Sequence, residues 1–297
     1  MCKEIIISDL KTREEVTNII TAIAGSADDQ YPELIRARTD KYRDDIILFA
    51  NLIKSATSSP ELLEKIRAHV KPTSRMTMLK LFRRCVCSVC DTEATKKKNI
   101  PTESFIYSYG HLFRKIDILK TTFQDITDSN IETLSALLGE YDNRGKSGYA
   151  LTTLFFDAFE NILGNDYSID GPTGAGSDIE LRTILKDFQD NCPCDFVIKR
   201  KKDNSPAAVG FARYDSTRGG AQSDDRTGGN SDKISKIYAF CFKYNIKLKI
   251  IFLSDGPGLA HRDTWEETRK IDRIYGDMVR VTTLKTLSDV IKKEWLD

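Results

Sequence analysis

Asp195-Phe-Val-Ile-Lys-Arg-Lys-Lys-Asp-Asn-Ser-Pro-Ala-Ala-Val-Gly-Phe-Ala-Arg-Tyr214 holds two apolar runs separated by a polar turn that contains proline. Residues 195–199 and 207–214 have the composition and length of strands, and residues 202–206 are typical of a turn. This stretch therefore predicts a β-hairpin.

Helical and strand patterns alternate on both sides of the hairpin. Apolar residues at helical spacing precede it at 149–163 and 180–188, where Ser177 and Glu180 have the spacing of a capping box. After it we expect a helix around Ile234, strands at 247–253 and 278–283, and helices at 264–274 and 284–295. This order predicts a three-layer α/β core with a mixed sheet.

The first part of the chain is helical in pattern throughout. Apolar residues recur at helical spacing in segments that cover most of the chain up to about residue 130. We therefore expect a helical N-terminal region at 1–135, used for dimerisation or for embracing a ligand, and an α/β core at 136–297.

Composition limits the class of protein. The 297 residues include 45 lysines and arginines against 44 acids, so any basic surface must be local. No apolar run approaches the roughly 20 residues that span a bilayer, and the N-terminus does not have the pattern of a signal peptide. These features predict a soluble protein that resides in the cytoplasm.

Three of the seven cysteines, Cys85, Cys87 and Cys90, stand close together. Three thiols could hold zinc if a fourth ligand came from elsewhere, because structural zinc takes four ligands. The alternative is a set of buried free thiols on a helix. A zinc-stabilised interaction protein therefore remains one hypothesis.

One face of the predicted hairpin gathers charge. Side chains alternate along a strand, so Phe211, Arg213 and Asp215 share a face. A turn near Asp203 or Asn204 sets Asp195 opposite a residue between Phe211 and Arg213, and with the turn at Asn204 it joins Arg213 and Asp215 on that face. Two carboxylates can hold Mg²⁺ through oxygen, and the ion acidifies water and shields phosphate charge. A surface salt-bridge ladder on an edge hairpin would use the same residues.

The spacing of these residues resembles a known superfamily. Asp195 followed on the next strand by Phe211-Ala-Arg213 is similar to the Asp…Glu-x-Lys signature of PD-(D/E)xK nucleases, in particular type II restriction endonucleases. The segments 143–151, 250–256 and 279–295 resemble the elements that flank the catalytic hairpin there. The resemblance covers residues 140–297 and implies a restriction-endonuclease-like core, Mg²⁺, double-stranded DNA as substrate and a homodimer.

The sequence departs from this signature at one important position. Phe211 stands where the family has glutamate, and Arg213 stands where it has lysine. The second acid must then come from elsewhere, and Asp215, Glu180 and Asp178 are the candidates. The resemblance thus implies catalytic residues Asp195, Arg213, Asp215 and Glu180, with metal ligands drawn from Asp195, Asp215 and Glu180.

The segment after the hairpin is rich in glycine and in residues that read bases. Arginine, asparagine and glutamine make paired contacts to guanine and adenine edges, and aspartate accepts from cytosine. We expect DNA contacts from a glycine-hinged arm, with candidates Arg218, Gln222, Asp224, Asp225, Arg226 and Asn230. A flexible polar loop is the alternative.

These inferences predict a sequence-specific, Mg²⁺-dependent endonuclease of double-stranded DNA. The missing glutamate leaves a second hypothesis open, a non-catalytic nucleic-acid-binding protein built on a nuclease-like scaffold.

Overall fold

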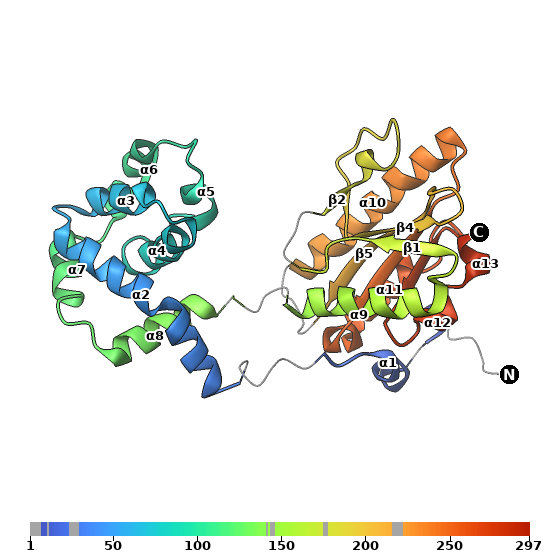
Figure 1. Ribbon diagram of the computed structural model, residues 1–297, viewed down its shortest axis with the longest axis horizontal. Coiled ribbons are helices and arrows are strands. Elements are labelled where there is room, and N and C mark those ends of the chain that lie inside the picture. Colours follow the sequence, from blue (N-terminus) through green and yellow to red (C-terminus); the bar gives the residue numbers. More distant parts are fainter. Residues whose placement is uncertain are drawn as a thin grey trace. The chain divides into compact units, whose positions relative to one another are not determined.

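The computed structural model describes residues 7–10, 12–23, 30–140, 142, 146–174, 178–215 and 222–297, with the backbone alone for residues 8, 146 and 222–228. The chain forms two compact units, one made of Met1–Ala24 with Gly145–Asp297 and the other of Gly25–Arg144 (Figure 1). The helical unit is therefore an insertion, whereas the sequence suggested a single boundary near 135.

Hydrogen bonds show why the N-terminal segment belongs to the α/β unit. The backbone N–H of Thr21 donates to the buried Asp255 carboxylate at 2.7 Å. Two residues later, the N–H of Ile23 donates to the Tyr214 hydroxyl at 2.9 Å. These bonds hold the segment at the end of two central strands, just before the chain enters the helical unit.

The helical unit has its own apolar core. Buried side chains from most of its helices meet there, among them Phe49, Leu62, Phe82 and Leu119. The helices are α2 (Glu33–Ser55), α3 (Ser59–Ala68), α4 (Pro72–Cys85), α5 (Thr92–Lys96), α6 (Thr102–Tyr109), α7 (Ile116–Thr122) and α8 (Asp128–Gly139). The helical spacing of apolar residues between 105 and 119 corresponds to two helices, because a 3₁₀ turn at Gly110–Leu112 separates α6 from α7.

A five-stranded mixed sheet forms the centre of the α/β unit. Its order is β1 (Tyr167–Asp170), β4 (Phe196–Arg200), β5 (Pro206–Tyr214), β6 (Lys249–Asp255) and β7 (Val279–Thr282). The first three strands are antiparallel, and β5, β6 and β7 run parallel. The hairpin predicted from 195 to 214 is thus β4 and β5.

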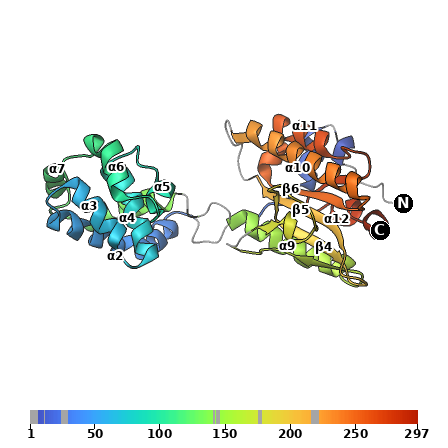
Figure 2. The same cartoon turned by 90° about the horizontal axis from the view of Figure 1, so that it is seen from above.

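Helices cover both faces of this sheet, as expected for three layers. On one face α9 (Lys146–Leu163), α12 (Leu287–Val290) and α13 (Lys293–Leu296) pack on one apolar core. On the other face α1 (Arg13–Ile19), α10 (Gln222–Tyr244) and α11 (Arg262–Ile271) pack on a second core. Figure 2 shows α9 and the pair α10 and α11 on opposite sides of the strands.

One predicted helix is wrong. Residues 179–180 form a short strand, β2, which pairs antiparallel with β3 (Pro193–Cys194). Only a 3₁₀ turn follows, at Leu181–Thr183, and no side chain caps it. Glu180 therefore does not belong to a helical capping box, and Ser177 lies outside the described residues. The apolar positions Leu181 and Phe188 are nevertheless buried, so the pattern marked core residues correctly.

Candidate functional site

The register of the hairpin places Asp195 opposite Phe211. Phe196 pairs with Gly210, and the N–H of Asp195 donates to the Gly210 carbonyl at 2.9 Å. The Asp195 carboxylate accepts a hydrogen bond from the N–H of Ala212 at 2.8 Å. Asp195 thus shares a face with Phe211, as predicted, and its register lies at the Phe211 end of the range from Phe211 to Arg213 that the sequence left open.

A second ladder brings another carboxylate to Asp195. Ile179 pairs with Cys194 at the end of this ladder, so Asp178 and Asp195 are the next residues on its two strands. Burial raises the pKa of Asp195, and the Asp178 charge raises it further, against the lowering effects of the Ala212 N–H and of Lys233. Two acids therefore repel each other at the start of β4.

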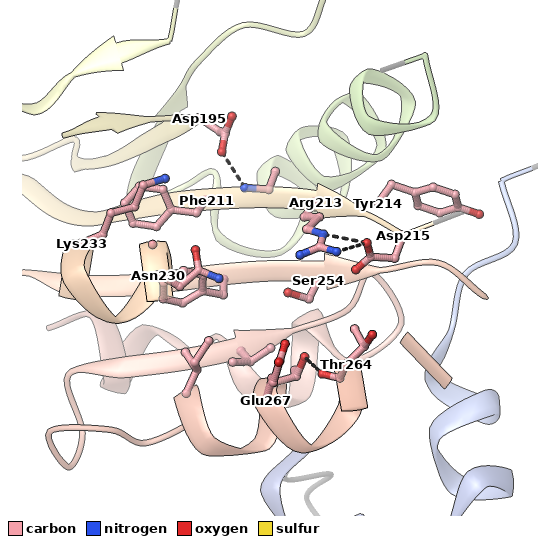
Figure 3. A pocket seen from close by; sticks show the side chains of 16 residues that line it. Asp195, Phe211, Arg213, Tyr214, Asp215, Asn230, Lys233, Ser254, Thr264 and Glu267 are labelled. Atoms are coloured by element: carbon pink, nitrogen blue, oxygen red, sulfur yellow. Dashed lines mark hydrogen bonds and ion pairs between the residues drawn. The ribbon is translucent and has the colours of Figure 1, made fainter. Parts of the chain in front are cut away.

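A cavity of about 510 Å³ opens beside Asp195, between the sheet and helices α10 and α11. Figure 3 shows the side chains that line it, which come from β5, β6, β7, α10 and α11 and from Asp195 and Asp215. Its polar and charged lining residues are Asp195, Arg213, Asp215, Asn230, Lys233, Ser254, Thr264, Glu267 and Thr268. A cavity in which charges of both signs converge is the usual form of a binding site for a polar ligand.

Two cations lie at different ends of this cavity. The Lys233 Nζ, from α10, is 4.3 Å from the centre of the Phe211 ring and lowers the pKa of Asp195. At the end of β5, Arg213 Nε donates to the Asp215 carboxylate at 2.7 Å, and its Nη2 contacts the same oxygen. A guanidinium has five N–H donors, so this pair leaves Arg213 able to donate to a further anion.

The far end of the cavity is fixed by a buried turn. Asp255 is fully buried, and its carboxylate accepts from the N–H groups of Thr21, Gly256 and Leu284 at 2.7, 2.7 and 2.9 Å. Gly256 has φ +101°, and a Cβ there would lie 2.5 Å from the Asp215 carbonyl oxygen. Only glycine allows β6 to turn this close to Asp215, so the strand end is held in place from two sides.

The structure brings together only some of the predicted site residues. Asp195, Arg213, Asp215 and Asn230 line one cavity, whereas Glu180, in β2, does not. Asp215 lies four residues beyond the partner of Asp195, about 13 Å along the strand, so the two carboxylates cannot share one ion. The expected metal set of Asp195, Asp215 and Glu180 is therefore not assembled, and Asp178 is the acid next to Asp195.

The expected base-reading arm is in part a helix. Helix α10 begins at Gln222, so the backbone of Gln222, Asp224, Asp225 and Arg226 is helical rather than a hinged loop. The side chains of these four residues and the whole of Arg218 lie outside the described residues. Asn230 is the member of the set whose side chain is described, and it faces the cavity (Figure 3).

Sequence reasoning missed Lys233 and Glu267. Lys233 stands three residues after Asn230 and directly before the buried Ile234, so a charge borders the sheet-facing side of α10. Glu267 lies between Thr264 and Ile271, on the α11 face that points to the cavity. In both helices a charge next to an apolar stripe was the available signal.

The thiols do not form a metal site in the described part of the chain. Cys87 and Cys90 are buried and interact with each other, and burial raises the pKa of Cys90 to about 12. Among the described residues no group of three or more histidine, cysteine or acidic side chains is arranged to hold a metal ion. The arrangement fits the buried-thiol alternative better than zinc.

Comparison with known proteins does not assign a function to the site. No protein family, no curated protein and no solved structure matches this chain. Within the described residues, every helix is too short or too polar to traverse a lipid bilayer.

Proposed function

We propose that the α/β unit is a Mg²⁺-dependent endonuclease that hydrolyses phosphodiester bonds of double-stranded DNA in the manner of a type II restriction enzyme. The observation that carries the proposal is that Asp195, on which the Asp178 charge acts, lines a cavity together with two cations. A carboxyl group whose pKa is raised by burial and by a neighbouring acid, as for Asp195, is typical of catalytic sites. The resemblance of the hairpin to the PD-(D/E)xK signature supplies the reaction class.

The residues at the start of β4 fit a magnesium ion. Mg²⁺ is bound through one or two carboxylates and completes its shell with water and substrate phosphate oxygens. Asp195 and Asp178 provide two carboxylates whose repulsion a cation would relieve. When bound, the ion would supply acidified water and shield the charge that grows on phosphate.

The remaining groups have roles that follow from their charge and position. Lys233, next to Asp195 across the Phe211 ring, would donate to a phosphate oxygen near the reacting bond. Arg213, held by Asp215, would bind a phosphate farther along the strand and orient the backbone. Such donors help catalysis most when they are held in place before the reaction, as both are here.

The fold supports the same proposal. An antiparallel hairpin that carries the acid, then a helix, then a parallel strand, corresponds to the restriction-endonuclease-like core that the resemblance implies. A palindromic site would call for a two-fold homodimer, because the symmetry of site and protein go together.

The departure at Phe211 favours one rival, a nucleic-acid-binding protein without catalysis. The Phe211 side chain has no carboxylate to replace the missing acid. It is buried, and its ring stacks on that of Phe252 with 5.2 Å between the ring centroids. The rival requires Asp178 and Asp195 to be inert in the presence of Mg²⁺.

Plasmid cleavage separates the two proposals. Supercoiled plasmids of diverse sequence would be incubated with Mg²⁺ and with the wild type, Asp195→Asn or Asp178→Asn, and Asp203→Asn would be the control in the distant hairpin turn. We expect discrete linear products that both site variants lose and the control retains. Uncut plasmid with every sequence tested, under conditions where the protein is folded, would exclude the enzyme.

A further inference from the structure

The basic residues of the helical unit are concentrated in one part of it. Residues 65–120 carry thirteen lysines and arginines against four acids. The remainder of residues 25–144 carries six basic residues against thirteen acids. Because the whole chain has a net charge of only +1, this segregation is local and is not a consequence of composition.

Six exposed members of this set lie around the ends of α4 and α5. We call them the basic surface: Arg83, Arg84, Lys96, Lys97, Lys98 and Arg114. Burial raises the pKa of the Cys85 thiol to about 11, while the positive charges of Arg114 and Arg84 lower it. Both arginines therefore lie near this thiol.

Asp91 lies between Arg83 at the end of α4 and Lys97 at the end of α5. The N–H groups of Ala94 and Glu93 lower the pKa of Asp91, and the charges of Arg83 and Lys97 lower it further. Helix α5 packs directly on α4, so these charges belong to one continuous region.

The backbone that displays these charges is held rigidly. The buried Arg67 guanidinium donates to the carbonyls of Lys97 and Ile100 at 2.7 and 2.6 Å and to the Thr102 hydroxyl at 2.8 Å. Arg114 is fixed through its own backbone, since its N–H donates to the Val86 carbonyl at 3.0 Å. Its carbonyl accepts from the Ser59 hydroxyl at 2.6 Å.

Helix ends explain only part of this charge. Basic side chains in the last turn of a helix interact favourably with its carboxyl end, which accounts for Arg83, Arg84 and Lys96. Lys98 and Arg114 lie in no helix. Repulsion among exposed like charges costs stability, and a bound polyanion would remove that cost.

We infer that the basic surface binds the phosphate backbone of duplex DNA, independently of base sequence. The choice of DNA as the polyanion rests on the proposed function of the α/β unit. Phosphate contacts position a protein on the duplex, whereas base contacts specify the site. Because the two units are one chain, binding by one raises the effective concentration of DNA at the other.

The test measures how salt affects binding of the full chain to a 30-base-pair duplex without Mg²⁺, by fluorescence anisotropy. One variant combines Arg84→Gln, Lys97→Gln and Arg114→Gln. The matched control combines Lys202→Gln, Lys243→Gln and Lys247→Gln, three exposed lysines of the α/β unit with the same change in charge.

Each lost phosphate contact should reduce the slope of log K against log[salt] by about 0.9, so for three contacts we expect a reduction of about 2.7 and roughly 500-fold weaker binding at 0.1 M salt. The control should keep the wild-type slope. Equal slopes for the two triple variants, or no duplex binding by the wild type, would overturn the inference.

Two further measurements keep the outcomes distinct. Lys97→Gln and Lys98→Gln alone should each lower the slope by about 1, which guards against misfolding of the triple variant. If the wild type leaves every plasmid uncut with Mg²⁺ while the basic-surface variant still loses its salt slope, the endonuclease is refuted and the DNA-binding surface stands.

Discussion

Replacing Asp195 by asparagine should stabilise the protein at neutral pH while it abolishes the proposed cleavage. Burial and the Asp178 charge raise the pKa of Asp195 despite the Ala212 N–H and Lys233, so the folded state disfavours the charge. The asparagine oxygen can still accept the hydrogen bond from Ala212. The substitution therefore removes the destabilising buried charge and keeps the hydrogen bond from the Ala212 N–H.

The sign of the pH dependence follows from the direction of this shift. Because the folded pKa lies above the unfolded value of about 3.9, the penalty is absent below that pH and grows as the pH rises through the folded pKa. Repulsion between like charges on neighbouring strands costs up to about 1 kcal/mol. The variant should then melt up to about 4 °C higher at pH 7, and the difference should vanish near pH 3.

Thermal unfolding of the wild type and the variant at pH 7 and pH 3 would measure this difference. Asp203→Asn is the control in the turn of the same hairpin, because the Ser205 hydroxyl and N–H lower the pKa of Asp203. That control should lose stability at pH 7. If Asp195→Asn also proves less stable than the wild type at pH 7, Asp195 is a structural carboxylate and the reasoning fails.

Magnesium extends the same prediction to function. At ten times its Kd, Mg²⁺ should stabilise the wild type by about 1.4 kcal/mol through binding to the folded state alone. Asp195→Asn should lose most of this gain, since one of the two carboxylates is gone. Equal stabilisation of both proteins would show that Mg²⁺ binds elsewhere.

Two further predictions concern the cavity and its edge. Lys233→Gln should slow plasmid cleavage by about 10²-fold, as loss of one held donor does, while Lys236→Gln one turn away on α10 should not. Gly256→Ala should cost about 1–3 kcal/mol in urea unfolding, because φ is positive and the new Cβ meets the Asp215 carbonyl. Gly276→Ala, also at positive φ but with open space around the Cβ, should cost less; equal losses would show that the close contact is unimportant.

The hairpin was predictable because its pattern is strong and local. Two apolar runs and a polar turn fixed the strands to within one residue, and alternation then placed Phe211, Arg213 and Asp215 on one face. The face was correct, and the observed register lies at the Phe211 end of the range from Phe211 to Arg213 that the sequence left open. Registers that differ by two residues keep each side chain on the same side of the strand, so the sequence could fix the face without fixing which residue stands opposite Asp195.

Other elements carried weaker local signals. In β1 the sequence Tyr167-Ser-Ile-Asp170 alternates apolar and polar residues, but over four residues alone, the shortest run that indicates a strand. Strand β2 is two residues long and exists because it pairs with Pro193–Cys194. Residues 180–188 do have apolar positions at helical spacing, and these reach the core from a 3₁₀ turn and irregular chain. Spacing identified the buried residues but could not determine the backbone between them.

The Asp178–Asp195 pair shows which part of the site the sequence could not give. Both acids were candidates, but their proximity depends on two ladders that meet at Asp195, which follows β3 and precedes β4: Asp178 adjoins β2, and Phe211 lies in β5. The residues next to Asp195 in the sequence do not by themselves determine the register of either ladder. A pair of neighbouring acids costs stability unless a cation joins it. Lys233 and Arg213 lie at the two ends of the cavity beside the pair, where they can bind an anion. A metal ion bound by the acids would bring such an anion with it, which is why the proposed substrate is a phosphodiester.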